Sequence, residues 1–180
     1  MNRSSTLAVV GLGYVGLPLS IAMTQAGYDV VGVDVDADRV AALRNGRSYV
    51  RDVSDATVDV ALERGFRPTT DYEAVSDAAA VSVCVPTPLR KTGRPDVSLV
   101  ASSAERLARV IPDECVVIVE STVYPGATAN LVAPLLENEG KTVGEDVYVA
   151  FSPERIDREG SGDDWVRTRR GLSGGAQTDR

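Results

Sequence analysis

Short apolar runs alternate along the chain with longer stretches whose apolar residues recur at helical spacing. Apolar runs of four to seven residues are typical of strands that are buried on both faces of a parallel sheet. The pattern predicts strands at residues 7–10, 29–33, 66–69, 79–85, 115–119 and 147–150. It predicts helices at residues 15–26, 36–45, 54–64, 97–110 and 127–139, with a helical turn at 72–76.

Glycines close most of the predicted helices, as expected for helix C-terminal caps. They lie at Gly27, Gly46, Gly65 and Gly140. Strands that alternate with helices of this length indicate parallel pairing through right-handed crossovers. The sequence therefore predicts an α/β fold with a doubly wound, mostly parallel sheet.

Charge and composition exclude several classes of protein. The 180 residues carry a net charge of −7, with 26 acidic and 19 basic side chains, which argues against a general nucleic-acid binder. There is no His, so the commonest general base and metal ligand is missing, and we expect no metal site. Cys84 and Cys115 lie in apolar runs and are interpreted as reduced core thiols.

The apolar stretch at residues 7–23 superficially resembles a targeting or membrane segment. Glycines at positions 11, 13 and 16 and a proline at position 18 interrupt it, and it is too short to span a bilayer. We therefore expect no targeting segment, no membrane association and a cytoplasmic location.

A glycine-rich turn joins the first predicted strand to the first helix. Gly11 allows the tight turn, Gly13 allows a pyrophosphate to approach the backbone, and Gly16 allows the helix to pack closely on the strand. The helix N-terminus adds N–H donors and a positive dipole end. The order of strand, turn, helix and a later acidic residue predicts a Rossmann-like site for a dinucleotide; the alternative is a turn kept for packing.

The acidic residue that this motif requires is Asp34, at the end of the second strand. A carboxylate there accepts hydrogen bonds from the adenosine ribose and repels a 2′-phosphate, which favours NAD over NADP. Arg39 complicates the choice, because a guanidinium can hold a 2′-phosphate. The alternative is that Arg39 is a helix residue paired with Asp36 or Asp38.

Three further polar groups follow strands, where ligands bind in open parallel sheets. Thr87 lies in a proline-rich turn, Ser121 and Thr122 precede the helix at 127–139, and Glu154 follows the last strand. Thr122 is suited to orient a water or substrate oxygen, and Glu154 is a candidate general base. Their structural alternatives are a stiffened turn, a helix cap and a salt bridge with Arg155.

Together these motifs resemble the UDP-glucose/UDP-N-acetylhexosamine 6-dehydrogenases, over about residues 6–175. The sequences GYVGLPL at 13–19, ESTVYPG at 120–126 and SPERI at 152–156 are closer to the N-acetylhexosamine branch. The matching pieces are GLGYVGLPL at 11–19, VDVD at 33–36, CVPTPL at 84–89, ESTVYPG at 120–126 and FSPERI at 151–156.

The resemblance implies oxidation of a UDP-sugar's C6 alcohol to a carboxylate with two NAD. It implies that a cysteine captures the intermediate aldehyde as a thioester, which is then hydrolysed. Glu154 then corresponds to the acid/base residue that assists hydrolysis, and Thr122 helps to orient water. The implied cofactor contacts are Tyr14, Val15, Asp34, Arg39, Thr87 and Thr122, besides the glycine-rich turn.

The family's cysteine and its Lys, Asn and Asp partners belong to a second half that nothing here matches. We therefore expect residues 1–156 to form the NAD-binding domain and residues 157–180 to form a loop, with a strand-like pattern only at 170–173. The chain is expected to be truncated before the middle and C-terminal domains and inactive alone. Self-association through an apolar patch near Val166 and Leu172, or a separately encoded C-terminal half, is expected.

Three functions remain open from the residues. The first is the NAD-binding portion of a nucleotide-sugar 6-dehydrogenase. The second is an NAD-binding module without catalysis, or one half of a split enzyme. The third, a relative of the 3-hydroxyacid dehydrogenases, fits the CVPTP and ESTVYPG pieces poorly.

Overall fold

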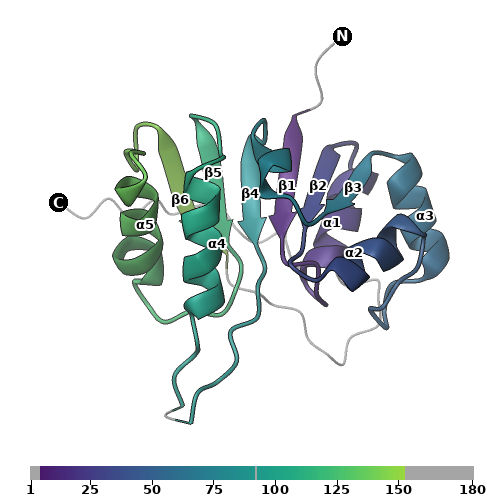
Figure 1. The fold of residues 1–180 in the computed structure, drawn as a ribbon, viewed down its shortest axis with the longest axis horizontal. Helices are drawn as coiled ribbons and strands as arrows, with labels where there is room; N and C mark the ends of the chain where they lie inside the picture. The colour runs from purple at the N-terminus through teal and green to yellow at the C-terminus, as the bar shows by residue number, and fades with distance from the viewer. Residues whose placement is uncertain (1–4, 92, 153–180) are drawn as a thin grey trace.

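A six-stranded parallel sheet forms the centre of the molecule. The computed structural model describes residues 5–91 and 93–152 (Figure 1). The strand order is β3-β2-β1-β4-β5-β6, and every neighbouring pair is parallel. The strands are β1 (Thr6–Val10), β2 (Asp29–Val33), β3 (Phe66–Thr69), β4 (Ala80–Val83), β5 (Cys115–Val119) and β6 (Val147–Phe151).

Strand order reverses between β1 and β4, which places a topological switch point at their carboxyl ends. In open α/β sheets this is where the loops diverge and leave a crevice for a ligand. The predicted doubly wound α/β fold is confirmed, and in the described residues all pairing is parallel.

Helices cover both faces of the sheet, and each face has its own apolar cluster. One cluster joins the sheet to α1, α2 and α3, around Leu17, Leu43 and Phe66. The other joins it to α4 and α5, around Leu107 and Leu136. The helices are α1 (Gly16–Gln25), α2 (Ala37–Arg44), α3 (Asp55–Glu63), the 3-10 helix η1 (Tyr72–Val75), α4 (Ser98–Ala108), the π-helical turn η2 (Thr128–Val132) and α5 (Ala133–Asn138).

Side-chain caps fix the starts of α2 and α3. The Asp36 carboxylate accepts hydrogen bonds from the N–H groups of Asp38 and Arg39, and the Ser54 hydroxyl accepts one from the N–H of Thr57. Each cap satisfies backbone donors that the first helical turn leaves without a partner. The start of α2 therefore lies directly after Asp34, the predicted ribose-binding residue.

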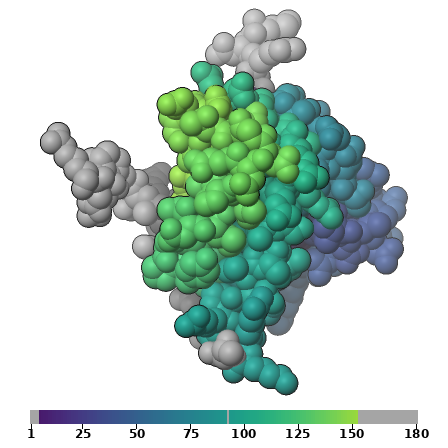
Figure 2. All heavy atoms as spheres, turned by 60° about the vertical axis from the view of Figure 1, so that its left-hand side comes forward, coloured from purple at the N-terminus to yellow at the C-terminus, as the bar shows by residue number. Residues whose placement is uncertain are grey.

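The segment between β4 and α4 projects beyond the carboxyl edge of the sheet as a narrow loop (Figures 1 and 2). An isolated antiparallel bridge joins Leu89 to Pro95, and the Arg90 guanidinium donates to the Asp96 carboxylate at 2.9 Å. That hydrogen bond holds the pKa of Asp96 well below its ordinary value. This segment begins with the proline-rich turn in which the sequence places Thr87.

Two of the differences between predicted and observed elements lie at prolines. The strand predicted at 79–85 stops at Val83, because prolines at positions 86 and 88 have no N–H to extend the ladder. The helix predicted at 127–139 begins as the π-helical turn η2 before it becomes α5. Pro134 explains this, since it cannot donate to the carbonyl one turn earlier. The strand-like pattern at 170–173 lies outside the described residues.

Nothing in the described part of the chain suggests a transmembrane helix. Each helix there is too short, or not apolar enough, to cross a bilayer.

Candidate functional site

The glycine-rich turn between β1 and α1 places its three glycines in three different environments. Gly11 has a φ of 91°, and a Cβ there would lie 2.8 Å from the Cys84 carbonyl oxygen. A Cβ on Gly16 would overlap the carbonyl oxygen of Gly11. Around Gly13, by contrast, a Cβ would meet nothing within 4 Å. The turn is therefore closed on two sides and open where a pyrophosphate would approach, so it fits a dinucleotide.

Three segments meet around this open side at the carboxyl edge of the sheet. They are the glycine-rich turn, the start of the loop after β4 and the segment after β5. The residues that line the pocket are Gly13, Tyr14, Val15, Cys84, Val85, Pro86, Thr87, Glu120, Ser121 and Thr122. Four residues for which the sequence predicts cofactor contacts, Tyr14, Val15, Thr87 and Thr122, thus line one pocket.

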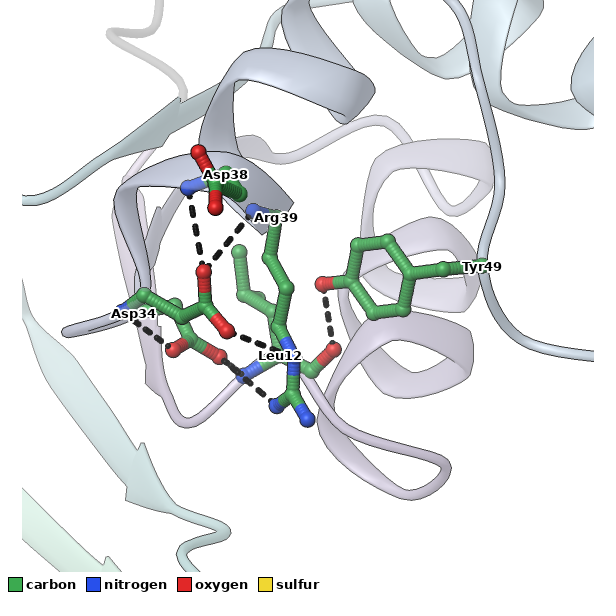
Figure 3. A network of polar contacts seen from close by, with 6 residues as sticks. Leu12, Asp34, Asp38, Arg39 and Tyr49 are labelled. Atoms are coloured by element: carbon green, nitrogen blue, oxygen red, sulfur yellow. Dashed lines mark hydrogen bonds and ion pairs between the residues drawn. The ribbon is translucent and has the colours of Figure 1, made fainter.

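Asp34 lies at the end of β2 beside the glycine-rich turn. Its side chain is 6% exposed. One carboxylate oxygen accepts a hydrogen bond from the N–H of Leu12 at 2.8 Å, and the other accepts one from Asp36 at 2.9 Å (Figure 3). These bonds orient the carboxylate at the start of α2, where a ribose diol would lie.

Arg39 is paired with carboxylates rather than standing apart. Its guanidinium lies 3.7 Å from the Asp34 carboxylate and 3.4 Å from that of Asp36, and its side chain is 45% exposed. Of the two partners expected for Arg39, Asp36 makes the ion pair, while the N–H of Asp38 donates to the Asp36 carboxylate. The geometry favours a paired Arg39 beside Asp34 over a guanidinium reserved for a 2′-phosphate.

Tyr49 joins the same network, and sequence reasoning missed it. Its hydroxyl donates to the carbonyl oxygen of Leu12 at 2.7 Å, and the Arg39 guanidinium lies 5.4 Å from the centre of its ring (Figure 3). Partial burial, followed by the charge on Asp34, raises the pKa of Tyr49 well above its ordinary value. A lone tyrosine in a polar loop gives no sequence signal of this contact.

The two hydroxyls after β5 behave differently. Ser121 is buried, and its hydroxyl donates to the carbonyl oxygens of Val85 at 2.7 Å and Val83 at 3.3 Å. Ser121 therefore joins two walls of the pocket rather than directing its proton into it. Thr122 is exposed at the pocket. The helical segment that follows begins after Ala127 with no side-chain cap, so the alternative of helix capping does not hold.

The two cysteines occupy different positions, and one differs from the prediction. Cys115 lies in β5 and is fully buried; burial raises its pKa to about 11, so the thiol stays protonated and unreactive. Cys84 is a reduced, buried member of the core cluster, as expected, but it was expected within the strand at 79–85. It lies one residue beyond β4, is buried, and lines the pocket beside Gly16. The early end of β4 brings it there.

Glu120 lines the pocket, although the sequence motifs did not identify it as a candidate site residue. It is 4% exposed, and the Ser82 hydroxyl lies 3.5 Å from its carboxylate. Its position one residue past a strand at the switch point was the available signal.

Glu154, the predicted general base, lies outside the described residues, as does the apolar patch expected near Val166 and Leu172. Among residues 5–91 and 93–152, no group of three or more acidic, Cys or His side chains could hold a metal ion.

The fold and site together define a dinucleotide-binding domain of the Rossmann class. The chain belongs to the UDP-glucose/GDP-mannose dehydrogenase family, and residues 5–180 match the NAD binding domain of that family. This agrees with the family resemblance of the five motifs and with NAD as the cofactor. It favours the nucleotide-sugar family over the 3-hydroxyacid dehydrogenases.

Several curated relatives are similar over most of this chain. It is 38% identical to UDP-N-acetyl-D-glucosamine 6-dehydrogenase of Pseudomonas aeruginosa over 83% of its residues. It is 36% identical to protein CapL of Staphylococcus aureus over 87%, and 33% identical to UDP-glucose 6-dehydrogenase AglM of Haloferax volcanii over 97%. The chain spans only 35%, 36% and 41% of these three relatives, respectively.

Solved structures of the family superimpose closely on the fold. A GDP-mannose dehydrogenase from Pseudomonas aeruginosa, solved as a ternary complex, matches 88% of this chain and 38% of its own, with a TM-score of 0.82 and 30% identity. A UDP-glucose dehydrogenase from Pyrobaculum islandicum matches 91% of this chain and 39% of its own, with a TM-score of 0.80 and 31% identity.

Proposed function

We propose that this chain serves as the NAD-binding portion of a nucleotide-sugar 6-dehydrogenase. One observation carries the proposal. The open side of the glycine-rich turn, the ribose-side carboxylate Asp34 and the threonine-bearing segments at Thr87 and Thr122 all lie at the same carboxyl edge. A dinucleotide laid along that edge spans from Asp34 to the pocket. The same edge is where a sugar must approach the cofactor.

Each group has a distinct task in this proposal. Asp34 binds the adenosine ribose, and the N–H groups at Gly13, Tyr14 and Val15 face the pyrophosphate at the start of α1. Thr87 and Thr122 bind the cofactor from the other two walls, and Thr122 also orients a water or substrate oxygen. Bound NAD supplies the hydride acceptor for oxidation at C6.

For the sugar, we favour a UDP-N-acetylhexosamine. The wording of residues 13–19, 120–126 and 152–156 supports this branch. Relatives with comparable identity are named for UDP-N-acetyl-D-glucosamine, UDP-N-acetyl-D-mannosamine, UDP-glucose and GDP-mannose. The substrate must therefore be assigned by competition among these sugars.

The 180 residues by themselves are proposed to bind NAD without turning over a sugar. The family resemblance assigns the thiolate nucleophile and its Lys, Asn and Asp partners to a second half. In this sequence Cys115 is fully buried in β5. Lys141, in the loop before β6 at the amino edge of the sheet, pairs with Asp113. Glu154 and Thr122 remain as the acid/base and water-orienting groups of half a site. Removal of a catalytic unit's members costs several orders of magnitude in rate.

The test is NADH formation, followed by its absorbance, with the purified chain and each of the four nucleotide sugars. We expect calorimetry to detect NAD binding and the assay to detect no sustained NADH production. Activity that appears only when a polypeptide with the family's cysteine-bearing half is added would support one half of a split enzyme. Sustained turnover by the chain alone would refute its proposed inactivity, and failure to bind NAD would refute the proposed function.

A further inference from the structure

The loop between α2 and α3 is anchored so that it presents Tyr49 to the glycine-rich turn. The N–H of Ser48 donates to the Asp55 carboxylate at 2.8 Å, which ties the loop to the start of α3. On the other side of the tyrosine, Val50 packs against the apolar cluster of α1 and α3, and Val53 is part of that cluster. The ring is therefore held in place from both sides, although it is 37% exposed.

The Tyr49 hydroxyl fixes one peptide of the glycine-rich turn. It donates to the Leu12 carbonyl at 2.7 Å, while the N–H of Leu12 donates to Asp34 at 2.8 Å. In a planar trans peptide, the N–H of the next residue points opposite to the carbonyl. Because the Leu12 carbonyl is held toward Tyr49, the N–H of Gly13 is directed away from it, on the residue whose surroundings are open.

The Tyr49 ring holds the Arg39 guanidinium. The guanidinium lies 5.4 Å from the ring centre, within the range of a cation–π interaction, and 3.7 Å from Asp34 (Figure 3). Asp36 completes the arrangement at 3.4 Å. Arg39 is thereby drawn toward two carboxylates and an aromatic face, which competes with any contact to a 2′-phosphate.

We propose that Tyr49 is a positioning residue of the dinucleotide site, whose hydroxyl orients the Leu12–Gly13 peptide and whose ring restrains Arg39 beside Asp34. This inference rests on NAD binding at the glycine-rich turn. The raised pKa of Tyr49 is consistent with it, since the hydroxyl remains a donor throughout the neutral range. Two separable effects follow: the hydroxyl contributes to affinity for NAD, and the ring contributes to discrimination against NADP.

Two substitutions separate these effects. Tyr49→Phe removes the hydrogen bond to Leu12 and keeps the ring under Arg39, whereas Tyr49→Leu removes both. Tyr28→Phe is the matched control, because Tyr28 is similarly exposed but precedes β2, at the opposite edge of the sheet. Calorimetric titration of each 180-residue chain with NAD and with NADP gives the affinities, and thermal unfolding shows that each variant is folded.

We expect Tyr49→Phe to weaken NAD binding roughly three- to ten-fold and to leave the ratio of the NAD affinity to the NADP affinity unchanged. We expect Tyr49→Leu to weaken NAD binding further and to narrow that ratio roughly two- to five-fold. A purely structural role would lower both affinities together and leave the ratio unchanged. NAD binding by Tyr49→Phe as tight as in the control would overturn the role of the hydroxyl, and an unchanged ratio in Tyr49→Leu would overturn the role of the ring. If the unsubstituted chain fails to bind NAD, the proposed function fails, and this inference with it.

Discussion

Gly13 and Gly16 lie in the same turn, but a side chain would have a different effect at each position. Space is open around Gly13, so a side chain there would project into the region that a ligand needs. Gly16 instead lies against the backbone of Gly11, so a side chain there would displace the turn itself. The order of the glycines in the motif predicts these two roles, and the space around each residue in the structure agrees with them. The structure leaves space open at Gly13 and closes it at Gly16, at the junction of β1 and α1.

For this reason, Gly13→Val is expected to abolish NAD binding while the domain stays folded. The added side chain occupies the pyrophosphate approach, and its Cβ would meet nothing within 4 Å. Gly16→Val is the contrasting variant, and we expect it to lower the melting temperature or prevent folding. Circular dichroism and calorimetry on both chains provide the measurements. Retained NAD binding by Gly13→Val would show that the dinucleotide lies elsewhere.

A second residue-scale prediction concerns cofactor choice. We expect the unsubstituted chain to bind NAD at least about ten-fold more tightly than NADP, the equivalent of about 1.4 kcal/mol, because the Asp34 carboxylate repels a 2′-phosphate. Asp34→Asn removes the charge. We expect it to weaken NAD binding and to reduce the preference for NAD over NADP. Asp38→Asn makes the same change on exposed α2 and serves as the control. Equal affinities in the unsubstituted chain would mean that Arg39 governs the choice.

Several site residues could be predicted because each carries a positional rule. The glycines follow β1, Asp34 ends β2, and Thr122 follows β5, so strand order alone brings them to one edge. Tyr49 could not be predicted, because its contact to Leu12 spans 37 residues and depends on how the loop after α2 is anchored. Cys84 was misplaced, because an apolar run does not show where a strand ends.

At the scale of elements, the strands β2, β3 and β5 have the predicted bounds, although β3, with the sequence Phe-Arg-Pro-Thr, is not an apolar run. Buried parallel strands are continuous apolar segments, and the closing glycines separate them clearly from the helices. Two of the remaining differences lie at prolines, which remove backbone donors. Prolines 86 and 88 follow the early end of β4, and Pro134 follows a π-helical turn. Hydrophobic periodicity carries no information on such local changes in the hydrogen-bond ladder.

Helix α3 provides an element-scale test, because a single side chain, which does not line the pocket, caps it. Ser54→Ala removes the acceptor for the N–H of Thr57 and is expected to lower the free energy of unfolding by about 1 kcal/mol. Ser102→Ala, on the exposed side of α4, should leave the free energy of unfolding unchanged or raise it slightly, because Ala favours the helix more than Ser does. Urea unfolding gives both values. NAD affinity is expected to stay the same in both variants, and a loss in Ser54→Ala would link the cap to the Tyr49 loop.

At the scale of the whole molecule, the ligand site joins parts that meet only in the folded state. Its walls come from the glycine-rich turn, from the loop after β4 and from the segment after β5, which are distant in sequence. Asp34 adds a fourth segment at the end of β2. An unfolded chain cannot present these groups together. NAD binding must therefore be coupled to global folding of the domain.

That coupling predicts a measurable gain in thermal stability. A ligand that binds only the folded state at a hundred times its dissociation constant contributes about 2.7 kcal/mol. For a domain of this size, that corresponds to a rise in melting temperature of roughly 5–10 °C. Differential scanning calorimetry with increasing NAD is expected to show this rise, with a smaller one for NADP at the same concentration. Gly13→Val is the control, since it should remain folded and show no response. A melting temperature that NAD leaves unchanged at that concentration would contradict a site assembled by the fold.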